Sequence, residues 1–361
     1  MKRFALLVML LAVCVSVSAY AGPSVVLAED WDGLVKEYPN PFASYATDVS
    51  GITTITPAGW SGVGLEYILN RRARTYWGTP RLRNLSGAFE GVPVSLTFQV
   101  DSSKSFQVGT VIVSQNVGPS PFSNDTPYTL AFGNSNGSGV VWDSFSVAGP
   151  GKLGTIQYRV ETISQVAMFD TLCLTGTSAS YAGSGGYFDL GEIIILPDRL
   201  ELLKATGSLD GYAGWGGPQD LVDLVGSAGW MAVNNPSAKE LRLTFDFDGL
   251  QAVDAIVFCS YQNHSAQFTL SYLDGDGKEV EVAFIDMSGE ANVGGWTLPL
   301  QFLKSIETTT IYLDFVWPDD GKGRIPALQK VMFFTAAPPI PEPATMTLLA
   351  LGGVALLRRR K

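Results

Sequence analysis

Histidine is nearly missing from this sequence, which holds only His264 among 361 residues. One histidine excludes a metal site built from several imidazoles and any H-E-x-x-H motif. It also makes a serine–histidine–aspartate triad depend on that single residue. We therefore expect a protein that is not an enzyme.

Cysteine is also scarce, with only Cys14, Cys173 and Cys259 in the chain. Cys14 lies in an apolar run at the N-terminus, so the body keeps two cysteines, too few for a disulfide framework. Cys173 and Cys259 each sit in an apolar, strand-like run. Because unpaired cysteine is among the most buried residue types, we expect two buried thiols, with a bridge as the alternative.

Basic residues are outnumbered, with 24 Lys and Arg against 34 Asp and Glu and a formal net charge of −10. Six of the basic residues lie within a few residues of the two chain ends, so the body between them is still more acidic. Affinity for duplex nucleic acid rests largely on neutralised phosphates, which excludes nucleic acid as a partner. The same negative charge makes an anionic membrane surface an unfavourable partner for the body.

The N-terminus has the three parts of a secretory signal. Lys2 and Arg3 precede an apolar run over Phe4–Val17, which is followed by Ala19-Tyr20-Ala21. This is the small-residue pattern at which signal peptidase cleaves, so we expect cleavage after Ala21. Residues 1–21 are then a signal peptide, and the mature chain is exported.

The C-terminus carries a second apolar run, Thr345–Leu357, which is only thirteen residues long. A bilayer-spanning helix needs about 20 apolar residues, so this run is short for a permanent anchor. It follows Pro341, Glu342 and Pro343 and precedes four consecutive cations, Arg358–Lys361. Cations beyond an apolar run stay on the cytoplasmic side and leave the body outside.

This three-part order resembles the PEP-CTERM sorting signal. The resemblance implies that a membrane enzyme, exosortase, cuts the tail near Pro-Glu-Pro and that the body reaches the cell surface or an extracellular exopolysaccharide matrix. Contact with the membrane would then occur only through the transient segment 338–361. The alternative is a plain C-terminal anchor that is never processed.

An internal repeat relates the two halves of the body. Segments of the first half recur in the same order in the second, and the offset between the copies declines steadily. The matched segments are 96–98 with 243–245, 127–137 with 267–277, 171–174 with 310–313, and 191–196 with 329–334.

The repeated segments have the pattern of β-strands. In Leu241–Phe247 apolar residues alternate with polar ones, the period of a strand with one buried face. Gly-rich turns such as Asp274-Gly-Asp-Gly separate the runs, as in hairpins. The sequence therefore predicts an all-β protein of two tandem jelly-roll sandwiches, residues 22–197 and 198–337, followed by a proline-rich spacer.

The order of these elements resembles the discoidin, or coagulation-factor type C, family of galactose-binding-like jelly rolls. The similarity is best over Trp230–Asp274, where a tryptophan precedes a long alternating strand and then the runs VDAIVF and FTLSY. The resemblance implies a carbohydrate ligand, such as an exopolysaccharide, held by loops at one end of the sandwich, and a possible structural calcium. Trp77 and Trp230 match the family's core tryptophan.

Two groups of residues are candidates for ligand binding, because a sugar site needs an aromatic face surrounded by planar polar groups. In the first copy they cluster before Trp77, where the alternative is a solvated face paired with acids. In the second copy they fall in comparable loops. The candidates are Trp60, Arg71, Arg72, Arg74 and Tyr76 in the first copy, and Trp215, Asn234, Asn235 and His264 in the second.

Three further possibilities stay open. Asp274-Gly-Asp-Gly lacks the EF-hand pattern, which favours a plain hairpin turn. A glycoside hydrolase would need two facing carboxylates, for which Asp170, Asp189 and Glu192 are equally eligible. The sequence favours non-catalytic carbohydrate binding at the cell surface, and the alternative is a structural matrix protein with no sugar pocket.

Overall fold

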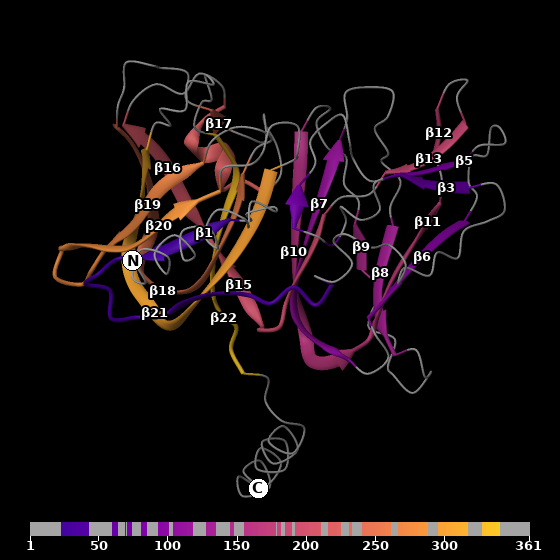
Figure 1. Cartoon of the computed structure of the whole chain (residues 1–361), viewed down its shortest axis with the longest axis horizontal. Coiled ribbons are helices and arrows are strands. Elements are labelled where there is room, and N and C mark those ends of the chain that lie inside the picture. Colours follow the sequence, from indigo (N-terminus) through magenta and orange to yellow (C-terminus); the bar gives the residue numbers. More distant parts are fainter. Residues whose placement is uncertain are drawn as a thin grey trace, which may run out of the picture.

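The body of the chain is built from β-strands arranged in sheets (Figure 1), as shown by a computed structural model. The all-β prediction is thus confirmed. The structure describes residues 23–42, 60–63, 69, 71–73, 81–84, 93–100, 104–117, 128–134, 145–147, 155–177, 179–181, 185–189, 192–210, 216–224, 231–232, 240–260, 266–287, 295–316 and 327–339.

Two long strands organise the second half, β18 (Glu240–Ser260) and β21 (Gly295–Val316). They pair antiparallel along their lengths, with register shifts between Asp246 and Gln251 and between Val253 and Ala255. Such irregularities bend a strand, so each strand runs through one sheet, turns over and returns through the other.

The two sheets of the second half share β18 and β21. The outer sheet uses the start of β18 and the end of β21. Its other strands are β16 (Ala205–Asp210), β19 (Gln267–Leu273), β20 (Glu279–Asp286) and β1 (Ser24–Leu27). The middle sheet uses the end of β18 and the start of β21. Its other strands are β2 (Val35–Glu37), β4 (Arg72–Ala73), β15 (Leu200–Leu203), β17 (Met231–Ala232) and β22 (Ala327–Ala336). A 3-10 helix, η4 (Pro218–Leu221), lies between β16 and β17 in the sequence.

The first half forms three smaller sheets. One contains β7 (Phe106–Val117), β10 (Thr155–Phe169) and β14 (Ile193–Leu196). A second contains β6 (Pro93–Gln99), β8 (Tyr128–Gly133), β9 (Phe145–Val147) and β11 (Thr171–Thr177). The third contains β3 (Trp60–Val63), β5 (Arg81–Asn84), β12 (Ala179–Tyr181) and β13 (Gly185–Asp189).

Strand pairing reproduces the internal repeat. In each half a central leucine pairs with one leucine on either side, and the matched positions are those aligned from the sequence. The triplets are Leu96–Leu174–Leu130 and Leu243–Leu313–Leu270. The two halves therefore share a topology as well as a sequence pattern.

The two N-terminal strands do not pair within the first sandwich, to which the sequence assigned them. β1 pairs with β20 and β2 pairs with β21, so residues assigned to the first sandwich (22–197) complete both sheets of the second. The same segment then reaches Phe42, which is buried in the core of the first half. The segment thus links the two halves beyond the single crossing between β14 and β15.

A separate core joins the two halves. The sheet formed by β7, β10 and β14 is covered on both faces. One face packs inside the first half, around Val111 and Val113, and the other packs against the middle sheet. Ile112 and Ile194 from the first half meet Val257 and Met332 from the second in this interface. Strands buried on both faces account for the unbroken apolar runs IIIL and AIVFC.

The second half has two distinct ends. At one, which we call the loop end, lie the paired residues Glu240 and Val316 together with Cys259 and Thr297. At the other, the tail end, β18 and β21 turn over and β22 finishes at Ala336. In Figure 1 the tail end, where β22 finishes, faces down.

Candidate functional site

An open cavity of about 730 Å³ lies at the loop end of the outer sheet. Its polar lining comes from one row of cross-strand neighbours, in the order Asp210, Arg242, Asp314 and Thr269. Each of these residues sits on a different strand, near the loop end. Leu241, Phe315 and Val316 supply the apolar part of the lining.

Arg242 is the fixed centre of the row. Its guanidinium donates to both carboxylate oxygens of Asp314, at 2.7 Å, and to both of Glu279, at 2.9 Å. It also lies 4.6 Å from the centroid of the Tyr312 ring, a cation–π contact. The hydrogen bonds that Arg242 donates to Asp314 and Glu279 raise its pKa. Burial works to raise the pKa of Glu279, but hydrogen bonds from Arg242 and Ser271 outweigh it and lower that pKa. The charges are therefore held in place before any ligand arrives.

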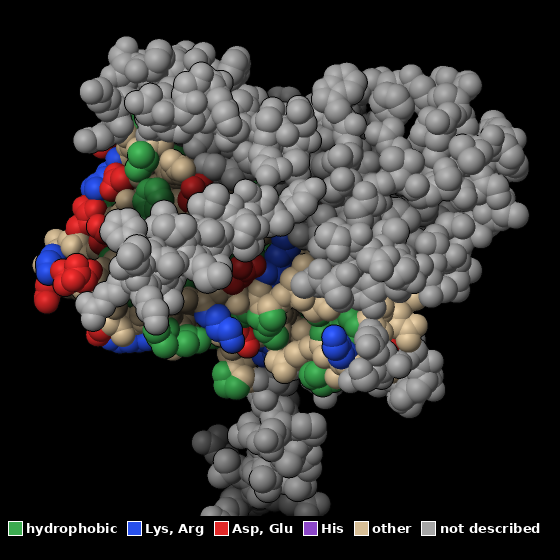
Figure 2. Space-filling model, in the orientation of Figure 1, with side chains coloured by type: hydrophobic (Ala, Val, Ile, Leu, Met, Phe, Trp, Pro, Cys, Tyr) green, Lys and Arg blue, Asp and Glu red, His purple; other side chains and the backbone are tan. Residues whose placement is uncertain are grey.

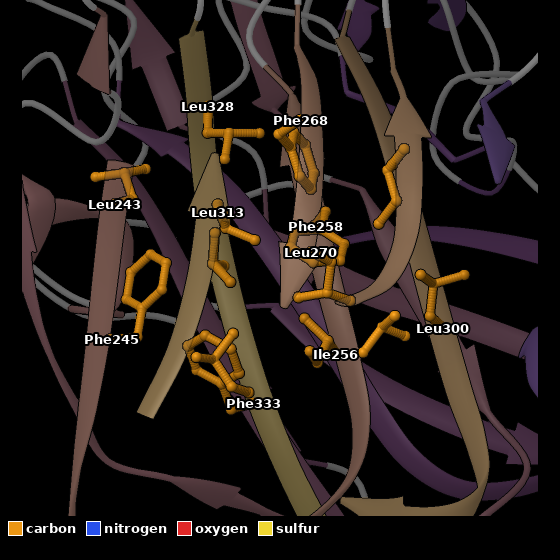
Figure 3. Close-up of a cluster of buried hydrophobic side chains, with 14 of the residues drawn as sticks. Leu243, Phe245, Ile256, Phe258, Phe268, Leu270, Leu300, Leu313, Leu328 and Phe333 are labelled. Atoms are coloured by element: carbon orange, nitrogen blue, oxygen red, sulfur yellow. The ribbon is translucent and has the colours of Figure 1, made fainter. Parts of the chain in front are cut away.

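The core beneath this sheet keeps the row rigid. Leu243, Phe258, Phe268 and Leu270 belong to the cluster of buried side chains in Figure 3, which fills the space between the outer and middle sheets. Because side chains alternate along a strand, burying Leu243 inward fixes Arg242 outward.

The second-copy candidates Trp215, Asn234, Asn235 and His264 lie outside the described residues, and their roles remain predictions. The described strand ends that flank them all lie at the loop end. β16 ends at Asp210, β18 starts at Glu240 and ends at Ser260, and β19 starts at Gln267. The chain therefore enters and leaves these candidate segments beside the cavity.

The first-copy candidates are not brought into one sheet. Trp60 opens β3, which pairs with β5, whereas Arg72 pairs with Trp296 of β21 in the second half. Arg74 and Tyr76 lie outside the described residues. The backbone thus divides a cluster that looks compact in the sequence.

Arg71 has a structural position. Its side chain is 6% exposed, and its guanidinium donates to Glu37 and to the carbonyl oxygens of Tyr38 and Pro39. Burial lowers its pKa, and the charge of Glu37 opposes that shift. These contacts favour a role in holding the N-terminal segment over the ligand-binding role predicted from the sequence.

The carboxylates considered for glycoside cleavage belong to different elements. Asp170 falls between β10 and β11, Asp189 ends β13, and Glu192 is buried against Thr297, whose hydroxyl donates to it at 2.7 Å. Burial raises the pKa of Glu192 to about 7. Glu192 belongs to the interface between the halves and does not line the cavity.

The acidic turn at Asp274 is a hairpin connection, as the sequence favoured. The Asp274 side chain accepts hydrogen bonds from the backbone of Asp276 and Lys278, and Gly277 has a φ of 76°. Among the residues that the structure describes, no three His, Cys, Asp or Glu side chains are grouped to hold a metal ion. Cys173 and Cys259 form no disulfide. Cys259 is buried, as expected, but Cys173 is only partly buried.

The contact between the cavity residues Arg242 and Asp314 was not predicted from the sequence. Alternation in the strand showed that Arg242 faces outward, but its partner is 72 residues away. Only the antiparallel register of β18 and β21 sets the two side by side.

The C-terminus matches the PEP-CTERM protein-sorting motif over residues 339–361, which include Pro341, Glu342 and Pro343. The resemblance noted in the sequence is thereby confirmed. The motif marks the chain as an exported cell-surface protein that exosortase processes. No helix within the described ranges is long and apolar enough to span a membrane.

Several solved carbohydrate-binding domains are similar to parts of this chain. A family 32 carbohydrate-binding module from Clostridium perfringens NanJ, in complex with galactose, has 13% identity and a TM-score of 0.31, over 38% of this chain and 99% of that one. The fucolectin of striped bass (Morone saxatilis) serum has 10% identity and a TM-score of 0.29, over 84% of this chain and 100% of that one. The family 32 module of AlyQ, in complex with 4,5-unsaturated mannuronic acid, has 15% identity and a TM-score of 0.30, over 38% and 99%. No curated protein sequence matches the chain.

Proposed function

We propose that this exported surface protein binds polysaccharide without cleaving it, through the loop end of its second sandwich. The observation that carries the proposal is the cavity at that end, with its fixed row of Asp210, Arg242, Asp314 and Thr269. A concave site with a few well-placed polar groups beside apolar surface is the usual form of a small-ligand pocket.

The chemistry of the row suits sugar hydroxyls. A hydroxyl group both donates and accepts hydrogen bonds, whereas an ionised carboxylate only accepts them and has about four acceptor positions. Each oxygen of Asp314 uses one of its positions on Arg242, which leaves others directed to solvent. Asp210 and Thr269 extend the same row on either side. The row therefore offers acceptors to neighbouring hydroxyls of one sugar.

The orientation of the body supports the same proposal. β22 leaves the middle sheet at the tail end, so the segment that continues into the sorting motif starts opposite the cavity. Trp215, Asn234, Asn235 and His264 belong to connections that begin and end at the loop end. A ligand outside the cell would approach these residues from the side away from the tail.

The partners that we propose for the protein are a polysaccharide ligand, exosortase and, for cleavage after Ala21, signal peptidase. Calcium is a possible addition, so the binding experiment includes it as a variable.

The test is binding of the mature chain to a panel of polysaccharides, including the producer's own exopolysaccharide, with calcium and with chelator. An Asp210→Ala, Thr269→Ala variant removes cavity hydrogen bonds, and Glu201→Ala, on an exposed position of β15, is the matched control. Hydrogen bonds to charged groups contribute about 1.5–3 kcal/mol, so the cavity variant should bind at least about tenfold more weakly while the control binds normally.

Three outcomes would count against the proposal. Unchanged binding by the cavity variant would move the site elsewhere, and a Trp60→Ala, Arg74→Ala variant then tests the first copy. Absence of binding to every glycan by the folded protein would favour the structural matrix role. Release of new reducing ends from a bound polysaccharide would identify a glycoside hydrolase.

A further inference from the structure

Large apolar side chains are exposed at the tail end of the body. Leu34 and Leu250 are each 59% exposed, Leu303 is 55% exposed and Met168 is 50% exposed. Single exposed leucines are normal on a protein surface, but grouping at one end is not. In Figure 2 hydrophobic side chains, in green, lie along the lower surface of the molecule beside basic ones, in blue.

The strand register places these residues at the same end. Leu250 and Leu303 lie where β18 and β21 turn from one sheet to the other. The carbonyl oxygen of Leu34 accepts the amide of Leu303. Met168 comes from the first half and pairs with Gln107, whose side chain donates to the carbonyl oxygen of Pro197, in the crossing from β14 to β15 at the tail end.

The root of the sorting tail is fixed to this end. The carboxylate of Asp254 accepts the amide of Ala336 at 2.7 Å and the hydroxyl of Ser305, which lies two residues after Leu303. Arg199 donates to the carbonyl oxygen of Pro338 at 2.7 Å. The chain is therefore held to the body as far as Pro338, beside the exposed leucines.

The length of the tail limits the distance between the body and the membrane. Six residues, 339–344, separate Pro338 from Thr345, where the apolar run of the sorting motif begins, so the connection has seven residue-to-residue steps. An extended chain spans at most about 3.3–3.6 Å per residue, so this connection reaches about 25 Å. While the tail is in the membrane, the tail end of the body cannot be farther than that from the bilayer core.

We propose that, until exosortase cuts the tail, the tail end of the body rests on the membrane surface, with Leu34, Leu250, Leu303 and Met168 in the lipid interface. The charges at this end are of both signs, with Lys304 next to Asp32 at 3.7 Å. Apolar side chains, and not attraction to anionic lipid, therefore provide the contact. The contact also turns the loop end away from the membrane.

The experiment uses the uncut mature chain, reconstituted through its tail into phosphatidylcholine vesicles. Cys173→Ser leaves the buried Cys259 as the native thiol, and one new cysteine is introduced for an NBD fluorophore. Leu250→Cys reports the tail end, and Ser24→Cys is the matched control, because Ser24 is exposed on β1 and pairs with Asp286, the partner of Gln267 at the loop end. Both positions are at the surface, so labelling should not disturb folding.

We expect blue-shifted NBD emission at position 250, quenched by lipid carrying a doxyl group near its head group, and water-like, unquenched emission at position 24. Adding Leu34→Asp and Leu303→Asp should abolish the quenching at 250. Equal emission at the two positions would overturn the proposal. A blue shift at 250 without quenching by doxyl lipid would also overturn it, because a protein would then cover this surface. Neither readout depends on sugar binding, so the two proposals fail separately.

Discussion

Replacing Glu192 with glutamine should change how the stability of the protein depends on pH. Glu192 lies in the core between the two halves, 3% exposed, and one of its carboxylate oxygens has no hydrogen-bond partner among the described residues. Burial raises its pKa from 4.5 to about 7, against the hydrogen bond from Thr297 and the charge of Arg71, which both lower it. Ionising this group therefore costs more in the folded protein than in the unfolded chain.

The sign and size of the effect follow from linkage. Because the folded-state pKa lies above the unfolded value, the contribution of Glu192 is full below pH 4.5 and is lost as the pH rises through about 7. Each unit of pKa difference corresponds to about 1.4 kcal/mol, so the loss amounts to about 3 kcal/mol. Glutamine keeps the shape of the side chain and its acceptor for Thr297 but does not ionise.

The assay is urea unfolding of the wild type and of Glu192→Gln at pH 4.5 and at pH 8.5. Between these values the free energy of unfolding of the variant should improve relative to wild type by about 3 kcal/mol, whatever the offset between them at low pH. Glu201→Gln, at an exposed position, should show no such change. An offset for Glu192→Gln that is the same at both pH values would refute the account of this buried group.

Two other substitutions test close contacts inside the body. Gly109→Ala should lower the free energy of unfolding, measured by thermal unfolding, by about 1–3 kcal/mol, because a Cβ there would meet the carbonyl carbon of Asp198 at 2.3 Å. Gly133→Ala is the control in the same experiment, because a Cβ at position 133 would meet only open space. Lys330→Met should cost about 2 kcal/mol in urea unfolding at pH 7, because the buried ammonium group donates to two backbone carbonyls next to η4 that would lose their partner. A Lys330→Met protein as stable as wild type would contradict that assignment.

The sequence was informative where the signal is local. Alternation in Leu241–Phe247 predicted a strand with one buried face, and the structure buries Leu243 and Phe245 while Arg242 faces outward. The internal repeat was more informative, because two copies of one sequence pattern also predict the same strand pairing in both halves. The C-terminal motif was readable for the same reason, since its three parts are contiguous.

Contacts between residues far apart in the chain could not be predicted from the sequence. Nothing in residues 24–37 indicates that they pair with strands more than 200 residues later. Arg71 looked like a binding residue because its partner, Glu37, and the carbonyl groups that it binds are more than 30 residues upstream. The same difficulty hid the Arg242–Asp314 pair, since register is a property of the folded sheet.

The core between the halves bears on how two repeated units act together. If both copies bound one polysaccharide on flexible tethers, the effective concentration of the second site would depend on a linker. Here the faces of β7, β10 and β14 pack directly against the middle sheet, and the N-terminal segment contributes to both halves. The halves therefore keep a fixed spacing. If the first half also bound sugar, this fixed spacing would favour long polymers whose repeating units match it and would give no advantage with a single sugar. Avidity for a polymer, and not affinity for one sugar, is therefore the quantity that would reveal a second site.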